Sequence, residues 1–146
     1  MLPDISVIEF IKSHHVLTLA TCAASAPYCS NMFYALLEKE FCLVFTSDRN
    51  TKHISDVSEN PVVAGSIVLE TETVGKIRGL QFCGKMMEVS GKLKTKAIAT
   101  YLRRFPYAVL SGTPVWVVEL TYTKFTDNRL GFGRKLVWEK NENSNL

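Results

Sequence analysis

Hydrophobic residues recur along this chain in short runs separated by polar turns, a pattern typical of antiparallel β-proteins. The polar segments 24–27 and 38–40 have hairpin length, so the runs that flank each of them are expected to pair as antiparallel strands. The pattern predicts six principal strands and a shorter last strand after a turn within 125–140. The principal strands are expected at residues 16–22, 28–37, 41–47, 62–69, 77–91 and 115–123.

Three other segments have the spacing of short helices. Apolar residues three apart after Asp4 predict a helix from Ile5 to about Lys12, and Lys52 lies in a second short segment of helical character. Apolar residues at helical spacing predict a third helix from Lys94 to Phe105. Strands with mostly short connections and three small helices imply a closed or nearly closed antiparallel barrel. No P-loop and no glycine-rich dinucleotide motif is present, which excludes the P-loop and Rossmann nucleotide folds.

The size and composition of the chain favour one domain. With 146 residues, 47% of them hydrophobic, the chain can bury a substantial core. We expect a single domain over residues 1–140 and a disordered polar tail at 141–146. No apolar run approaches the roughly 20 residues of a membrane span, and the N-terminus lacks the basic-then-apolar pattern of a signal peptide. A cytoplasmic protein without a membrane partner is therefore expected.

Neither a metal nor a nucleic acid is the ligand that the composition favours. The four cysteines are too far apart for a CxxC motif and lie in apolar runs, so buried reduced thiols are expected, and no metal site. The net charge is only +3, and the basic segment 92–104 fits a solvated helix face better than a nucleic-acid surface. No nucleic-acid partner is expected. The cysteines are Cys22, Cys29, Cys42 and Cys83.

The segment 41–63 carries the clearest candidate for ligand chemistry. An apolar strand ends at Thr46 and Ser47 and continues into the short helix that carries Lys52. Free amides at the helix start, two hydroxyls and one ammonium would converge on one point, and a phosphate is the ligand that best uses them. The alternative is that the two hydroxyl residues only end a strand and that the lysine lies in solvent.

Three motifs resemble the FMN-binding split-barrel family related to pyridoxamine 5'-phosphate oxidase, and within it a small bacterial branch. They are FTSDRNTKHISDVSENPVV at 45–63, RGLQFCGKMMEVSG at 78–91 and TDNRLGFGRKLVW at 126–138. The resemblance covers nearly the whole chain. It implies a mainly β fold with flanking helices, built on a six-stranded antiparallel split β-barrel. Relatives of this kind form twofold dimers with FMN at the interface, so FMN and a homodimer are expected.

The resemblance also implies which residues hold the cofactor. On the phosphate and ribityl side these are Phe45, Thr46 and Ser47, with Thr51 and Lys52 binding the phosphate. Asn31, Met32, Phe33 and Tyr34 match the strand beneath the flavin ring, where Met32 and Phe33 fit an ordinary barrel strand equally well. Gln81 matches a glutamine that contacts FMN, and its amide can both donate and accept. Asn128, Lys135 and Trp138 are expected to close the site from a second subunit, with plain core or dimer packing as the alternative for the tryptophan.

Two departures from the family pattern affect the expected chemistry. The oxidase pattern often has an arginine at the position of Thr51, so weaker or differently arranged phosphate binding is expected, and Arg49 could compensate. The C-terminal motif lacks the arginines with which true pyridoxamine phosphate oxidases bind their substrate's phosphate. Vitamin B6 phosphate is therefore not the expected substrate.

The leading functional hypothesis is an FMN-dependent oxidoreductase that acts on a small-molecule substrate or NAD(P)H, because flavin itself supplies the difficult chemistry. No catalytic triad, paired carboxylates or HExxH motif points to hydrolysis, and no catalytic residue is predicted. The alternative is a non-catalytic module that holds flavin or haem on the same barrel. For haem, the iron ligand would have to come from His14, His15 or His53.

Overall fold

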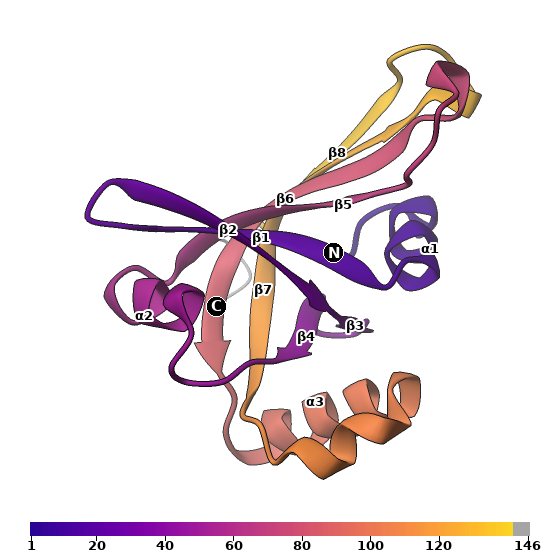
Figure 1. Ribbon diagram of the computed structural model, residues 1–146. Helices are drawn as coiled ribbons and strands as arrows, with labels where there is room; N and C mark the ends of the chain where they lie inside the picture. The colour runs from indigo at the N-terminus through magenta and orange to yellow at the C-terminus, as the bar shows by residue number, and fades with distance from the viewer. Residues whose placement is uncertain (142–146) are drawn as a thin grey trace.

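The computed structural model describes residues 1–141, with the side chains of 109–111 left out; the expected tail at 142–146 lies outside the described residues. It consists of an eight-stranded antiparallel sheet with three α-helices around it (Figure 1). The neighbours along the sheet are β2-β1-β5-β6-β7-β4-β3, and β8 pairs with β7. The strands are β1 Val16–Ala23, β2 Ala26–Phe33, β3 Ala35–Leu37, β4 Cys42–Thr46, β5 Val62–Val68, β6 Arg78–Glu88, β7 Val115–Asp127 and β8 Lys135–Glu139. The helices are α1 Ile5–Ser13, α2 Lys52–Glu59 and α3 Gly91–Arg104, with 3-10 turns η1 Val74–Lys76, η2 Pro106–Ser111 and η3 Asn128–Leu130.

The sheet curls into a half-barrel because its two ends belong to one continuous stretch of chain. β2 and β3 stand at opposite ends of the strand order, yet only Tyr34 separates them. The Tyr34 amide donates to the His15 carbonyl at 3.0 Å, and its ring is fully buried, so the chain turns inward at this point. The expected mainly β class with flanking helices is confirmed, but the count of six strands is wrong. The strand expected at 28–37 is interrupted at Tyr34 and forms β2 and β3, and the expected shorter last strand forms as β8 and joins the same sheet.

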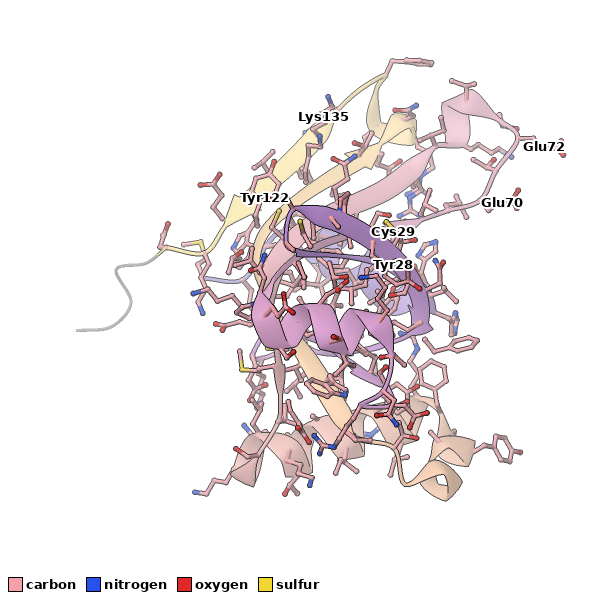
Figure 2. All side chains as sticks on the ribbon, turned by 60° about the vertical axis from the view of Figure 1, so that its left-hand side comes forward. Tyr28, Cys29, Glu70, Glu72, Tyr122 and Lys135 are labelled. Carbon is pink, nitrogen blue, oxygen red and sulfur yellow. The ribbon has the colours of Figure 1, made fainter. Side chains whose placement is uncertain are left out.

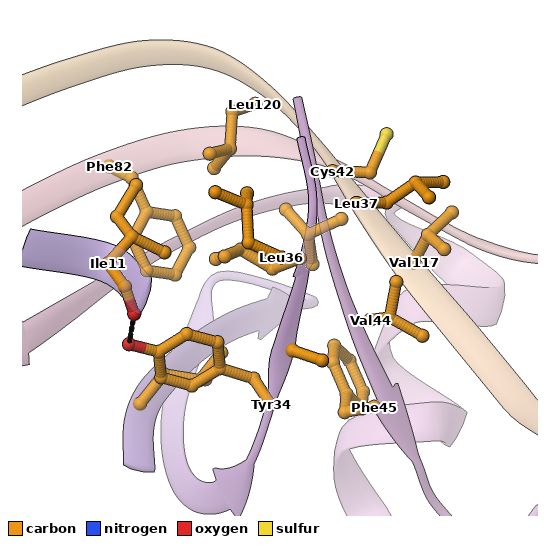
Figure 3. Packing of buried hydrophobic residues seen from close by; sticks show 14 of the residues in the cluster. Ile11, Tyr34, Leu36, Leu37, Cys42, Val44, Phe45, Phe82, Val117 and Leu120 are labelled. Carbon is orange, nitrogen blue, oxygen red and sulfur yellow. Dashed lines mark hydrogen bonds between the residues drawn. The ribbon is translucent and has the colours of Figure 1, made fainter. Parts of the chain in front are cut away.

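The core lies inside the curl of the sheet, where alternate strand residues meet α1 (Figure 3). Leu17 and Leu19 of β1 are completely buried, as is Phe10 of α1. The Tyr34 hydroxyl donates to the Ile11 carbonyl at 2.6 Å, which fastens the end of α1 to the chain between β2 and β3 (Figure 3). Burial of this hydroxyl raises its pKa above the ordinary range of tyrosine.

The first and third helices form where the apolar spacing predicted them. Asp4 caps α1 by accepting a hydrogen bond from the Ser6 amide at 2.9 Å. α3 begins at Gly91, three residues before the expected start, and Ser90 occupies the N-cap position without a side-chain capping bond. At its end, Arg104 donates to backbone carbonyls of α1 and of Tyr34, which joins α3 to the first third of the chain.

The exposure of the cysteines differs from the expectation. Cys42 is buried, and burial raises the pKa of its thiol to about 11. Cys29 and Cys83 are exposed, and Cys22 is half-buried, so the expectation that all four are buried is wrong. The reason is that side chains alternate along a strand, and these residues point away from the core. All four are free thiols.

One end of the sheet extends beyond the barrel as an arm made by β6, β7 and β8, with the loop between β5 and β6 at its side (Figure 1). At the end of β7, Asp127 is 4% exposed in its side chain and pairs with Arg78 at 3.2 Å and Arg129 at 2.8 Å. Lys135 lies on this arm, as do Glu70 and Glu72 near its tip (Figure 2). None of the helices described here is long and apolar enough to cross a bilayer.

Close packing at Gly65 generates a test of the fold. A Cβ atom at this position would lie 2.3 Å from both the Phe82 ring and the Thr18 carbonyl oxygen. We expect Gly65→Ala to lower the free energy of unfolding by about 1–3 kcal/mol, the usual cost of overpacking. Gly75→Ala is the matched control, because nothing lies within 4 Å of its added Cβ. Equal urea-unfolding midpoints for the two variants would contradict this packing.

Candidate functional site

The start of α2 presents backbone donors that the protein itself leaves unused. Thr51 occupies the N-cap position, but its side chain makes no capping bond; its hydroxyl donates instead to the Asp48 carbonyl at 2.9 Å. The first helix amide that has a backbone acceptor is that of Ser55, which donates to the Thr51 carbonyl. Within the described residues, the amides of 52–54 therefore point outward without a backbone partner. Such an uncapped helix end favours an anion.

Side-chain hydroxyls lie directly beside these amides. The Ser47 hydroxyl lies 3.3 Å from the Thr51 hydroxyl and 2.6 Å from Nε2 of His53. The Trp116 indole donates to the Ser47 carbonyl at 3.0 Å, which fixes the end of β4 against β7. Desolvation lowers the pKa of His53 below its ordinary value, so the imidazole is neutral at physiological pH and can act as donor or acceptor toward the hydroxyl.

Lys52 is held beside the helix start by a buried carboxylate. Its ammonium donates to Asp56 at 2.8 Å and lies 5.1 Å from the centre of the Tyr28 ring. The second carboxylate oxygen of Asp56 accepts a hydrogen bond from the Thr21 hydroxyl of β1 at 2.8 Å. The Lys52 hydrogen bond, then that of Thr21, lowers the pKa of Asp56. Because the lysine side chain is 54% exposed, it can turn toward a ligand at the helix start.

The structure thus brings Ser47, Thr51 and Lys52 together, and we call the site formed by these residues and the amides of 52–54 the anion seat. Thr46 precedes the seat, but it lines a separate cavity of about 270 Å³ together with residues of α3. Phe45 is fully buried in the core. Any contact of Phe45 with a ligand would have to come from its backbone.

Of the four predicted ring-side residues, three lie on β2 and the fourth, Tyr34, follows directly after it. Asn31 and Phe33 point outward, and Asn31 donates to the Thr18 hydroxyl at 2.9 Å. Phe33 is 57% exposed. Met32 is half-buried and packs against the core, and Tyr34 is completely buried. Two of the four side chains are therefore available to a ligand on the outer surface.

Gln81 lies on the same outer face as Asn31. The strand register aligns Asn31, Thr18, Ser66 and Gln81 in one row across β2, β1, β5 and β6. Directly paired residues share a face of a sheet, and the row continues through Lys124 of β7 to Val137 of β8. A shallow hollow of about 430 Å³ lies over this row.

The three C-terminal candidates belong to the arm and to β8, away from α2 in the same chain (Figure 1). Asn128 is used within the arm, where its amide donates to the Val74 carbonyl at 2.9 Å and accepts from the Gly133 amide. Lys135 is exposed on the arm (Figure 2). Trp138 packs edge-on against a core phenylalanine and donates to the Met1 carbonyl at 3.0 Å.

Comparison with known proteins identifies the family. No protein-family profile matches the chain. The chain is 36% identical over 132 residues to a UPF0306 protein of Photorhabdus laumondii, an alignment that covers 90% of this chain and 92% of that protein. The chain belongs to the UPF0306 family. Similar proteins of the same family occur in Yersinia, at 35% identity over 140 residues.

Solved structures show how the UPF0306 chain folds. A haem-binding protein from Mycobacterium smegmatis matches it with a TM-score of 0.76 at 20% identity, over 95% of this chain and 59% of that one. An FAD-binding protein from Mesorhizobium loti matches with a TM-score of 0.68 at 14% identity, over 84% of this chain and 92% of that one. At these identities the likeness establishes the fold, which is the split-barrel type that the resemblance implied.

Two residues at the seat of the UPF0306 protein, Asp56 and Thr21, were not expected from the sequence; they hold the lysine in place. His53 was expected there only as a candidate haem ligand, and in the structure it bonds to Ser47. The partnership of Lys52 with Asp56 had a readable signal, since opposite charges four residues apart pair on a helix. The sequence carries no comparable signal for the role of Thr21, because 35 residues separate it from its partner Asp56. In residues 1–141, no group of three or more metal-ligating side chains is found.

The lowered pKa of Asp56 predicts a defined pH dependence of stability. Because the folded-state pKa lies below the ordinary 3.8, the ionised carboxylate stabilises the fold above that pH, and this contribution is lost as the pH falls through the lower value. We therefore expect Asp56→Asn to lower the urea-unfolding midpoint at neutral pH and the difference from wild type to shrink in strong acid. Glu59→Gln, a change to an exposed residue on the same helix, is the control. A difference that persists unchanged at low pH would contradict the assignment.

Proposed function

We propose that this UPF0306 protein is a flavoprotein that binds FMN with its phosphate in the anion seat, and that it acts as an oxidoreductase. The observation that carries the proposal is the uncapped start of α2, where Ser47, Thr51 and Lys52 surround amides without partners. A phosphate matches this donor set in charge and in number of acceptors. The fold shared with an FAD-binding protein supports a flavin as the bearer of that phosphate.

The strand beside the seat, β2, offers groups for the planar part of the cofactor. Lys52 lies over the Tyr28 ring, so the seat adjoins β2. The exposed Asn31 and Phe33 lie further along the same strand, on the face opposite Tyr28 because side chains alternate, so a flavin ring would have to pass the edge of β2 to reach them. Amide and aromatic groups in this arrangement can hydrogen-bond the polar edge of a flavin and pack on its ring. The Thr46 hydroxyl and the backbone of Phe45 are nearby in sequence and are proposed to face the ribityl chain.

We also propose that a second copy of the chain completes the site. Among residues 1–141, no helix covers the outer face of the sheet, and this face carries exposed apolar side chains, among them Val62 at 55% and Val68 at 63% exposure. Such a surface is typical of a protein interface. Lys135 and Asn128 lie on the arm, away from the seat of their own chain, so they can reach a cofactor only across a dimer. Gln81 and Trp138 are proposed to contribute from the same interface.

The protein's own groups would position the flavin and stabilise its charge. FMN supplies reversible hydride or electron transfer. Lys52 and the helix amides hold the phosphate, the hydroxyls of Ser47 and Thr51 orient it, and His53 fixes the Ser47 hydroxyl. A small-molecule substrate or NAD(P)H is the proposed electron donor.

Haem is the second candidate ligand, and His15 is the observation that favours it. Its imidazole is exposed and makes no hydrogen bond with the described residues, and its ring lies 6.4 Å from that of Phe105, which in turn lies 5.5 Å from Phe33. An open imidazole beside aromatic rings suits an axial ligand of haem. Absorption spectra decide between the two, since a Soret band on addition of haem that His15→Ala abolishes favours this candidate.

Replacement of Lys52 tests the phosphate assignment. We expect Lys52→Ala to weaken FMN binding by about 1.5–3 kcal/mol, the range for a hydrogen bond to a charged group, and to leave riboflavin binding unchanged because riboflavin has no phosphate. Quenching of flavin fluorescence measures both affinities. Lys76→Ala, on the distant η1 turn, is the matched control. An FMN affinity equal to that of wild type would remove Lys52 from the site.

A substitution at the centre of the outer face tests the dimer. Ala64 pairs with Ala20 on one side and with Cys83 on the other, and it lines the shallow hollow. We expect Ala64→Arg to convert a dimer to a monomer in sedimentation velocity and to weaken FMN binding at least tenfold, about 1.4 kcal/mol. Ala99→Arg introduces the same side chain on the exposed side of α3 as a control. A dimer that survives Ala64→Arg would exclude this face as the interface.

A further inference from the structure

A second cationic pocket lies between the end of α1, the β3–β4 turn and α3. It encloses about 430 Å³, and the buried strand β3 forms its floor. It shares no lining residue with the anion seat. The charged side chains that line it are Lys12, Glu38, Lys39, Glu40, Lys96, Arg103 and Arg104, so five positive charges face two negative ones.

The two carboxylates are already paired, which leaves an excess of positive charge. Glu38 accepts from Lys12 at 2.9 Å, and Glu40 accepts from Lys96 at 2.6 Å. The Lys96 hydrogen bond lowers the pKa of Glu40, so this carboxylate is ionised and satisfied at physiological pH. Arg103, which is exposed, has no ion-pair or hydrogen-bond partner within the described residues. The pocket therefore has charge that the protein does not neutralise.

Arg104 contributes a fixed cation at the inner wall. One of its nitrogens donates to the Tyr34 carbonyl at 3.1 Å, and another donates to the carbonyls of Lys12, at 3.1 Å, and His14. Its guanidinium also lies 5.4 Å from the centre of the Tyr34 ring. Neutral carbonyls and a ring leave its full charge in place, and because the side chain is already fixed it would lose little conformational entropy when a ligand binds.

The composition of α3 distinguishes this surface from an ordinary solvated helix face. The helix sequence GKLKTKAIATYLRR contains five basic residues and no acidic residue, so no ion pair forms within the helix. Lys96, Thr100, Arg103 and Arg104 are spaced at four, seven and eight residues and line the pocket together. Lys92 and Lys94 belong to the same helix but do not line it.

We propose that this pocket is a binding site for a small phosphorylated anion that carries at least two negative charges on its phosphoryl groups. Guanidinium groups match phosphate oxygens in geometry, a threonine hydroxyl can donate to one, and the volume lies in the range of small-ligand sites. The exposed pairs of Lys12 and Lys96 are weak enough for either lysine to turn to the ligand. This site does not depend on flavin binding at α2.

Titration of inorganic pyrophosphate into the full chain at low ionic strength tests the proposal, with calorimetry for affinity and amide NMR for location. The largest shift changes are expected in residues 36–40 and 100–104. Arg103→Gln should weaken binding about tenfold, as expected for the loss of a charged hydrogen bond. Lys94→Gln removes the same charge from the same helix outside the pocket and should have little effect.

Two further measurements make the outcome decisive. In the Lys52→Ala background pyrophosphate should still bind, which separates the pocket from the anion seat and from the fate of the flavin proposal. Equal affinities of the Arg103→Gln and Lys94→Gln variants would overturn the site. So would a single-stranded RNA oligonucleotide that competes for the same residues and binds more tightly than pyrophosphate, because the surface would then serve a nucleic-acid backbone.

Discussion

The buried carboxylate of Asp56 is the interaction on which the candidate site depends. One of its oxygens holds Lys52 and the other holds Thr21 of β1, so a single side chain both fixes α2 to the sheet and keeps the ammonium beside the helix start. The side-chain amide of Asn60 also donates a hydrogen bond to the Cys22 carbonyl at 2.9 Å. This bond fastens the other end of the short helix to the same strand. An eight-residue helix has little stability of its own, so these tertiary contacts determine where its amides point.

The same network explains why the seat can exist without a ligand. The Lys52 ammonium carries a positive charge, and the unpaired amides beside it carry partial positive charges. In the absence of an anion these groups would repel one another. Asp56 supplies the compensating charge from below the helix, where it does not occupy the seat. A ligand phosphate would then share the lysine with the carboxylate rather than capture it from solvent. Preorganisation of this kind reduces the ordering that binding requires.

Much of the architecture was readable from the sequence, because strand alternation and turn spacing are local signals. Most strands, the first and third helices and the proximity of Ser47 and Lys52 followed from that pattern, whereas Thr51 was expected only from the family resemblance. What could not be read was decided by contacts far apart in the chain. The inward turn at Tyr34 depends on acceptors in α1, and the exposure of Cys29 depends on which face of β2 lies outward. Sequence periodicity defines two faces but does not say which of them stays uncovered.

The guanidinium of Arg104 has a consequence for how the chain matures during synthesis. It closes contacts across 70 to 92 positions, with acceptors that all lie within the first 34 residues. Until the end of α3 has left the ribosome, those carbonyls lack their native donor. The edge of the β1–β2 hairpin stays uncovered until then. Completion of the amino-terminal part is thus deferred to a late stage of translation.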